Sequence, residues 1–441
     1  MIRLDGPDLF QLHQERADQP THTLKIAVLE RSVDDADVDA WAAERLTSLA
    51  PMRWVLAGPR WARPVLVDGG PPDLARHVTH ATLSEPGGEA ELRAALAALC
   101  SGPLDRAEPL WHLTHLTGLA GGRSALVFQV HHLLADGAAS VALWEALADG
   151  SAAPVAPAAP ATASPPRARD ALRAGAGDLA KLPGRVGRFL GASRRQVADA
   201  EHGPAQVFVG PMTSFNGPSE AARACAFVAL PLSDLQAVRA ASGATLTQVF
   251  LTVAGGAIRR FLVERDETLD AGLTATVPTA LPDRRHDYGN AVTTLYVALH
   301  SEVEDPTARL RAVGASLGAT RGATDVDPRI LPDLQRYPRL YGGLVSSMEW
   351  VAARKGRPAY NVIVSSVRGP RPFTLMGVPV VELRSLGPLS GHLGLNLTGW
   401  SYGDDFMVGI HSTASAGKDL DRLAALVADE LAALRREAAD A

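Results

Sequence analysis

Two adjacent histidines and an aspartate form the most chemically capable group of side chains in the sequence. The segment QVHHLLADGAAS, residues 129–140, contains His131, His132, Asp136 and Gly137. The apolar residues before it, SALVFQV at 124–130, predict a buried strand, and those from Ala138 onward predict a helix. The histidines are therefore expected at the end of a strand, where the chain turns into a helix.

Only one of these histidines can act on a substrate from a regular strand. Neighbouring strand residues point to opposite faces, so His131 and His132 cannot hold one metal ion or one substrate together. An imidazole that faces the site can take a proton from a hydroxyl or an amine, because its ordinary pKa lies near neutrality. The other imidazole is expected to pack in the core.

Asp136 and Gly137 shape the turn that follows the histidines. Asp136 could orient an imidazole, as the aspartate of a serine-hydrolase triad does. It could instead bind an arginine or backbone amides and fix the shape of the loop. Gly137 is expected to supply a backbone conformation that other residues resist.

Composition limits the classes of protein to which the chain can belong. With 441 residues, two domains are expected, and 46% hydrophobic and 21% charged residues are typical of a globular protein. A net charge of −5 argues against nucleic acid as a partner. The two cysteines, Cys100 and Cys225, suggest neither a disulfide framework nor a metal site. Without a secretory signal or a run of 18 apolar residues, a cytoplasmic protein is expected.

An Ala/Pro-rich stretch at 150–166 divides the chain and predicts a linker. The predicted parts are an N-terminal domain at 1–150, the linker with a basic crossover at 151–205, and a C-terminal domain at 206–441. Between Arg167 and Arg195 eight basic residues stand against two acidic ones, at roughly helical spacing. We interpret this segment as an amphipathic helix with a solvated basic face. The alternative is a docking surface for an acidic carrier protein or for the inner face of a membrane.

Helices and strands are predicted in both halves, which indicates an α/β fold. Strands are predicted at 124–130, 224–230, 273–277, 292–299, 361–365, 393–400 and 406–411. Helices are predicted at 90–99, 245–264 and 420–439, and a hairpin turn at 402–405. The sequence contains no phosphate-binding loop with lysine, so nucleotide chemistry is not expected.

The pattern H-H-x-x-x-D-G resembles the signature of acyltransferases related to chloramphenicol acetyltransferase. Over nearly its whole length the chain is similar to the bacterial wax ester synthase/diacylglycerol acyltransferase family. Residues 7–10 with 21–24 resemble the opening strand of that family. Further similar blocks are Pro59–Trp61, Pro103–Asp105, Pro109–Trp111, Thr213–Pro218, Gly289–Asn290, Asn361–Pro370 and Ser401–Gly403.

The resemblance implies two chloramphenicol-acetyltransferase-like domains in one chain, joined by a crossover linker, with a tunnel between them. It implies His132 as general base, a structural role for Asp136, and direct transfer from acyl-CoA to an alcohol without an acyl-enzyme. Acyl-CoA is then a co-substrate, and no cofactor is expected. The candidates for lining the site are Gln248, Asn290, Ser365 and Ser366.

The second half departs from the family pattern in the blocks expected near the acceptor. Thr247-Gln248 stands where Asn-Asp is usual, Ser365–Pro370 reads SSVRGP instead of SNVPGP, and His411-Ser412 stands where an aspartate is common. Three functions therefore remain open. The first is synthesis of wax esters or triacylglycerol from acyl-CoA. The second is the same chemistry with a hydroxyl or amine of a specialised metabolite as acceptor, or with a carrier-bound donor. The third is a non-catalytic binding module.

Overall fold

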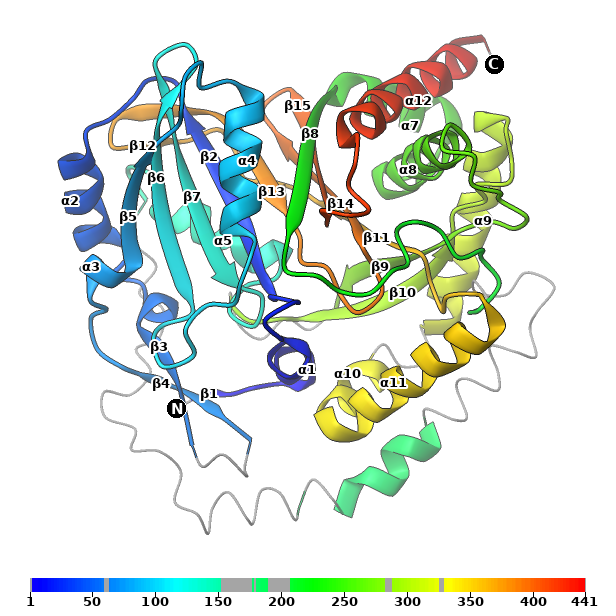
Figure 1. The fold of residues 1–441 in the computed structure, drawn as a ribbon, viewed down its shortest axis with the longest axis horizontal. Helices are drawn as coiled ribbons and strands as arrows, with labels where there is room; N and C mark the ends of the chain where they lie inside the picture. The colour runs from blue at the N-terminus through cyan, green and yellow to red at the C-terminus, as the bar shows by residue number, and fades with distance from the viewer. Residues whose placement is uncertain are drawn as a thin grey trace.

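Two six-stranded sheets organise the protein (Figure 1). The computed structural model describes residues 2–58, 63–151, 177, 180–188, 207–281, 288–324 and 329–440. Within these residues helices and strands mix in both halves of the chain, which confirms the α/β prediction.

The first sheet carries the histidine strand near its centre, in the order β12-β13-β2-β7-β6-β5. Its strands are β2 (His22–Leu29), β5 (Val78–Thr82), β6 (Trp111–Leu119), β7 (Arg123–His131), β12 (Thr374–Leu375) and β13 (Val378–Leu386). β12 and β13 come from the second half of the chain, and β13 pairs antiparallel with β2. Without β13 the buried strand β2 would present an unpaired edge. The sheets therefore do not divide where the linker divides the sequence.

The second sheet belongs wholly to the second half, in the order β10-β9-β11-β14-β15-β8. Its strands are β8 (Arg223–Pro231), β9 (Thr274–Ala280), β10 (Val292–Ala298), β11 (Val362–Val367), β14 (Leu395–Tyr402) and β15 (Asp405–Thr413). These strands confirm the predictions at 224–230, 273–277, 292–299, 361–365, 393–400 and 406–411. The hairpin turn at 402–405 joins β14 to β15, also as predicted.

A small sheet and a set of helices surround these two sheets in the described residues. The small sheet contains β1 (Ile2–Arg3), β3 (Trp54–Ala57) and β4 (Val65–Asp68). The helices are α1 (Gly6–Gln14), α2 (Asp35–Arg45), the 3-10 turn η1 (Ala50–Arg53), α3 (Leu74–His77), α4 (Glu89–Leu99), α5 (Gly137–Leu147), α7 (Leu232–Ser242), α8 (Leu246–Val263), α9 (Pro306–Thr324), α10 (Ile330–Gln335), α11 (Pro338–Lys355) and α12 (Leu420–Asp440).

One predicted element at the N-terminus is wrong. Residues 7–10 were expected in an opening strand, but they lie in helix α1. Pro7 stands in the first turn of α1, where its missing N–H costs nothing, and Asp8 accepts a hydrogen bond from the backbone N–H of Asp5. The strand, β2, begins at His22.

Helix α8 is the centre of the second core. Thr245 caps it as predicted, and its apolar residues pack with β8, β9, β11 and α12. Among the described residues it is the one helix whose length and mean hydropathy, 18 residues and 1.3, could suit a membrane span. Because 67% of it is buried inside the protein, we interpret α8 as a core helix.

Part of the basic segment binds the protein itself. Residues 180–188 are helical, and the rest of Arg167–Arg195 lies outside the described residues, apart from residue 177. Arg185 donates a hydrogen bond to the hydroxyl of Tyr337 at 2.7 Å, and Arg188 pairs with Asp333 at 3.3 Å. These contacts place the helix against α10 and the start of α11 (Figure 1). A carrier or membrane partner for the segment stays a prediction.

A buried ion pair should dominate the stability of the second core. Arg309 of α9 pairs with Glu430 of α12, and both side chains are buried. Arg309 also donates to the carbonyl oxygens of Val303 at 2.7 Å and Thr252 at 3.3 Å. Glu430→Gln should lower the free energy of unfolding by about 3–5 kcal/mol, since it leaves a buried guanidinium without its counter-charge.

Chemical denaturation measures this loss. The matched double variant Arg309→Met with Glu430→Leu removes both charges, so it should cost less than Glu430→Gln alone. A stability of Glu430→Gln within about 0.5 kcal/mol of wild type, the scatter of surface substitutions, would show that the pair contributes little.

Candidate active site

Asp136 holds the histidine loop through backbone amides. It caps α5, and its Oδ1 accepts from the N–H of Ala139 at 2.9 Å. Its Oδ2 accepts from the N–H of Ala291 at 3.0 Å, which belongs to the segment leading into β10. Asp136 thus ties the loop of the first half to the second half, and this is the structural role that the resemblance implied.

His131, one of the predicted catalytic residues, is buried beneath the loop. Its Nδ1 accepts from the N–H of Leu133 at 3.0 Å, so Nε2 must carry the proton. Nε2 lies 3.0 Å from Oγ1 of Thr21 and 3.3 Å from a carboxylate oxygen of Glu15. Burial opposes ionisation of Glu15, but the hydrogen bonds from His131 and Arg106 lower its pKa to about 2. Both nitrogens of His131 are thereby engaged in supporting the loop.

His132 faces the second half of the chain and meets Asn290. Nδ1 of His132 lies 2.7 Å from Oδ1 of Asn290. The amide nitrogen of Asn290 donates to the carbonyl oxygen of His132 and to Oδ1 of Asp8, the latter at 3.0 Å. Because both acceptors require the nitrogen end of the amide, its oxygen must face the imidazole.

This orientation sets the tautomer of His132. An amide oxygen only accepts, so Nδ1 carries the proton and Nε2 keeps its lone pair. No described residue bonds Nε2, and the His132 side chain remains partly accessible. The geometry therefore presents an unprotonated nitrogen, fixed in position, at the junction of the two halves.

The electrostatic environment keeps His132 neutral. Burial and the nearby charge of Lys25 lower its pKa to about 4, while Asp136 and the hydrogen bond to Asn290 act in the opposite direction. Burial likewise raises the pKa of Asp8 to about 7, against the hydrogen bonds from Asn290 and Asp5. Near neutral pH the imidazole is ready to accept a proton.

Lys25 brings a buried amine to the same region. It lies on β2, and its ammonium donates to Oγ of Ser385 at 2.7 Å and stands 4.9 Å from the ring centre of Trp400. Burial lowers the pKa of Lys25 to about 7, although Asp136 raises it. The sequence analysis did not identify Lys25, because a lysine in an apolar strand is expected at a solvated edge position.

Position 137 requires a glycine for a different reason from the one expected. It is the first residue of α5, and it is not among the residues with positive φ. The expectation of an unusual backbone conformation is therefore wrong. A Cβ at this position would lie 2.6 Å from Cγ2 of Val367, so glycine is needed for the close approach of α5 to β11. The left-handed backbone occurs instead at Gly289, with φ +72°, beside Asn290.

The predicted lining residues of β11 point to two sides of the strand. Val367 faces Gly137, so Ser365 shares the face directed at the histidine loop. Ser366 faces the other side, where its hydroxyl lies 3.1 Å from that of Thr247. Gln248 closes the capping box of α8, accepting from the N–H of Thr245 at 2.6 Å. Of these residues, Ser365 is the one that shares the strand face of Val367, which meets Gly137.

A cavity of about 430 Å³ lies between α1, α11 and the loop at 388–393. Phe10, His13 and Gln14 of α1 contribute to its wall, with Tyr360 and Leu393 opposite. His132 is not part of the lining. Helix α1 connects the two places, because it also supplies Asp8 to Asn290. The role of Asp8 was missed in the sequence, since it depends on a contact between residues 282 positions apart.

The comparisons with known proteins agree with this geometry. The wax ester synthase/diacylglycerol acyltransferase catalytic domain matches residues 4–250, and the C-terminal domain of the same family matches residues 288–435. A provisionally named diacylglycerol O-acyltransferase of Mycobacterium tuberculosis strain H37Rv is 31% identical, over 99% of this chain and 97% of its own length.

Solved structures show the same fold. A wax ester synthase/diacylglycerol acyltransferase from Marinobacter aquaeolei VT8 superposes with a TM-score of 0.70 at 22% identity, over 99% of this chain and 100% of the other. The first condensation domain of the calcium-dependent antibiotic synthetase gives 0.63 at 18% identity, over 100% and 96%. The expected fold of two chloramphenicol-acetyltransferase-like domains in one chain is thereby confirmed.

The close approach at Gly137 predicts a specific steric effect. Gly137→Ala should lower the free energy of unfolding by about 1–3 kcal/mol, because the new methyl group collides with Val367. Val367→Ala in the same chain should recover most of the loss. Gly318→Ala on the open face of α9 is the control and should be neutral or stabilising. Denaturant unfolding that finds Gly137→Ala as stable as wild type would contradict the contact.

The charge of Lys25 predicts a shift in the titration of His132. In the wild type, NMR titration of labelled histidines should place the pKa of His132 near 4. Lys25→Met removes a positive charge and should raise that pKa toward the ordinary value, while burial still holds it below. Thr23→Val, a neutral change on the same strand, should leave it unchanged. An unaltered pKa in Lys25→Met would show that the two groups do not interact.

Proposed function

The chain belongs to the wax ester synthase/diacylglycerol acyltransferase family, and we propose that it transfers an acyl group from acyl-CoA to an alcohol with His132 as general base. That it is an acyltransferase follows from the family. The proposal for the base rests on one observation: Asn290 fixes the proton on Nδ1 of His132 and leaves Nε2 free to accept another.

In the proposed reaction, Nε2 takes the proton of the acceptor hydroxyl while the hydroxyl oxygen attacks the thioester carbonyl. The new C–O bond gives a tetrahedral oxyanion, which collapses with cleavage of the C–S bond. The thiolate of CoA leaves and takes the proton back from the imidazolium. No acyl-enzyme forms, so a single base serves both proton transfers.

The surroundings of His132 support this cycle. A low pKa keeps the imidazole neutral at physiological pH, so that Nε2 retains its lone pair. When Nε2 gains its proton, the oxygen of Asn290 and the negative charge of Asp136 stabilise the imidazolium. The ammonium of Lys25 is a candidate to offset the negative charge that develops on the thioester oxygen.

We assign the donor to acyl-CoA as a co-substrate, with no resident cofactor. The cavity between α1 and α11 has a size typical of ligand sites and apolar walls that include Phe10, Met348 and Leu393. We propose that it receives the apolar chain of one substrate. Two free cysteines, Cys100 and Cys225, are compatible with the reducing cytoplasm, where we place the reaction.

The decisive experiment measures the release of free CoA from acyl-CoA. The full chain is given palmitoyl-CoA together with hexadecanol, a diacylglycerol, an alkylamine or no acceptor. His132→Ala should lower kcat by roughly 10²–10⁴ fold with the best acceptor, because general-base catalysis is lost. Its fold should be retained, since the side chain is only partly buried.

His112→Ala is the matched control, because His112 is partly buried on β6 and bonds Thr79 away from the loop. It should keep wild-type activity. Near-wild-type turnover in a folded His132→Ala variant would remove His132 from the mechanism. If CoA is released only when the amine is the acceptor, transfer to a specialised metabolite is favoured. If CoA is released with none of the acceptors, a non-catalytic binding module is favoured.

A further inference from the structure

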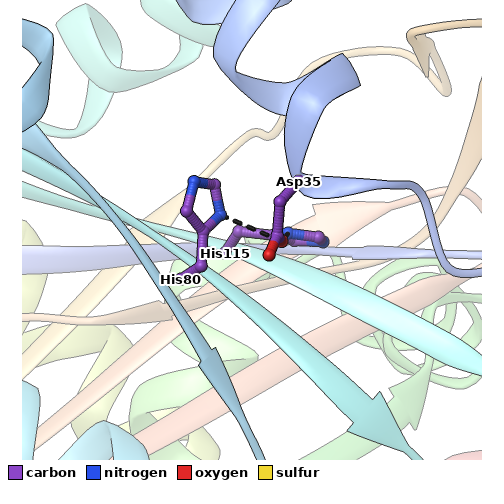
Figure 2. A group of neighbouring side chains, drawn as sticks. All are labelled: Asp35, His80 and His115. Atoms are coloured by element: carbon purple, nitrogen blue, oxygen red, sulfur yellow. Dashed lines mark hydrogen bonds and ion pairs between the residues drawn. The ribbon is translucent and has the colours of Figure 1, made fainter.

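A second group of histidines and carboxylates lies at the β5 edge of the first sheet (Figure 2). His80 of β5 and His115 of β6 are direct partners in the parallel pairing of these strands. Asp35 and Asp39 lie one turn apart on α2, which covers this edge (Figure 1). Three separate segments of chain therefore bring two imidazoles and two carboxylates together.

The side chains converge on a single oxygen atom. Oδ1 of Asp35 lies 3.0 Å from Nδ1 of His80 and 2.7 Å from Nδ1 of His115. The two rings stand nearly perpendicular, at 88°, with centres 5.8 Å apart. One ligand atom from each of Asp35, His80 and His115 lies within 4.8 Å of the others. Figure 2 shows both rings directed at the carboxylate of Asp35.

From this geometry we propose that Asp35, His80 and His115 bind a divalent transition-metal ion of the zinc type. Each residue offers one lone pair, from Oδ1 of Asp35 and from Nδ1 of each histidine. Zinc binds nitrogen and carboxylate oxygen at about 2.0–2.2 Å, which atoms already this close can reach with small side-chain movements.

Asp39 completes the arrangement from outside the ligand set. Its Oδ1 lies 3.0 Å from Nε2 of His80, the nitrogen that faces away from Asp35. A carboxylate that accepts the outer N–H of a ligating histidine fixes the ring and makes its other nitrogen a better ligand. The contact thus orients Nδ1 of His80 toward the metal position.

Burial and charge support a cation here. The side chain of His115 is fully buried, so its ring is held in place by the sheet, while Asp35 is 54% exposed and leaves an entry for the ion and a bound water. Helix α2 begins within the sequence DDADVD, which concentrates negative charge at 34–39. Two imidazoles with one carboxylate suit zinc, nickel or copper, whereas magnesium and calcium prefer oxygen ligands throughout.

The site is separate from the proposed base. It lies at the β5 edge, whereas His132 follows the inner strand β7 and contacts the second half of the chain. A metal ion would connect α2 to the edge strand β5 and to β6, which pairs with β7. The ion therefore acts in our proposal as a structural clamp on the first sheet.

The test uses the full chain after removal of metal by a chelator. Calorimetry with Zn²⁺ should show one site, and Co²⁺ should give the visible absorption of a coordinated ion. His80→Gln and Asp35→Asn each remove a ligand and should abolish this binding. Asp39→Asn removes the outer carboxylate and should weaken binding by roughly 10–100 fold.

His112→Gln is the control, because it alters a neighbouring histidine of β6 outside the cluster and should bind the ion as wild type does. Zn²⁺ should also raise the unfolding temperature of wild type and His112→Gln, but not of His80→Gln. If the wild type binds neither Zn²⁺ nor Co²⁺ at metal concentrations up to about 100 micromolar, roughly the weak end of specific sites, the proposal is overturned. Undiminished binding to folded His80→Gln and Asp35→Asn would overturn it as well.

Discussion

The hydrogen bond between His132 and Asn290 is the contact on which the proposed chemistry depends. It joins residues 158 positions apart, one from each half of the chain. Beside this contact, the carbonyl oxygen of Gly289 accepts a hydrogen bond from the N–H of Asp136. The N–H of Gly289 donates to the carbonyl oxygen of Leu134 at 2.6 Å. The loop that carries the base is therefore complete only when the segment before β10 lies across it. Assembly of the site thus requires contact between the two halves of the chain.

This dependence explains why the loop residues divide their roles as they do. Three residues keep the backbone in place: His131 through Thr21 and Glu15, Asp136 through amides, and Gly137 through its lack of a side chain. Of the two loop histidines, His132 is the one with a ring nitrogen that no described residue bonds. Rigid support for a single reactive atom is the arrangement that efficient general-base catalysis requires, because misplacement of the base by even 1 Å is costly.

The local patterns of the sequence were sufficient for much of the fold and for the position of the histidine pair at the end of a strand. Strands β7, β8 and β15 and helices α4, α8 and α12 follow from apolar periodicity and caps, which are short-range signals. The alternation of strand residues correctly indicated that the two imidazoles would point in different directions and that one of them would pack in the core. The H-H-x-x-x-D-G motif gave the order of these residues.

Long-range contacts were beyond the reach of those patterns. Nothing in the residues around Asp8 or Lys25 indicates that one meets Asn290 and the other Trp400. The crossing of β13 into the first sheet is likewise a property of the whole topology. Gly137 shows the same limit on a smaller scale. Its position in a turn suggested backbone freedom, whereas the cause is a valine 230 positions later in the chain.

The structure also separates what the family shares from what could distinguish this chain. The histidine loop is supported from α1, β2 and the segment at 289–291, and its chemistry is independent of what else binds. In the proposed reaction the acceptor would instead approach along the face of β11 that is directed at the histidine loop. Ser365 lies on that face, in one of the blocks where the sequence departs from the family pattern. In the proposed mechanism, selectivity for the acceptor is therefore expected from the second sheet and proton transfer from the first.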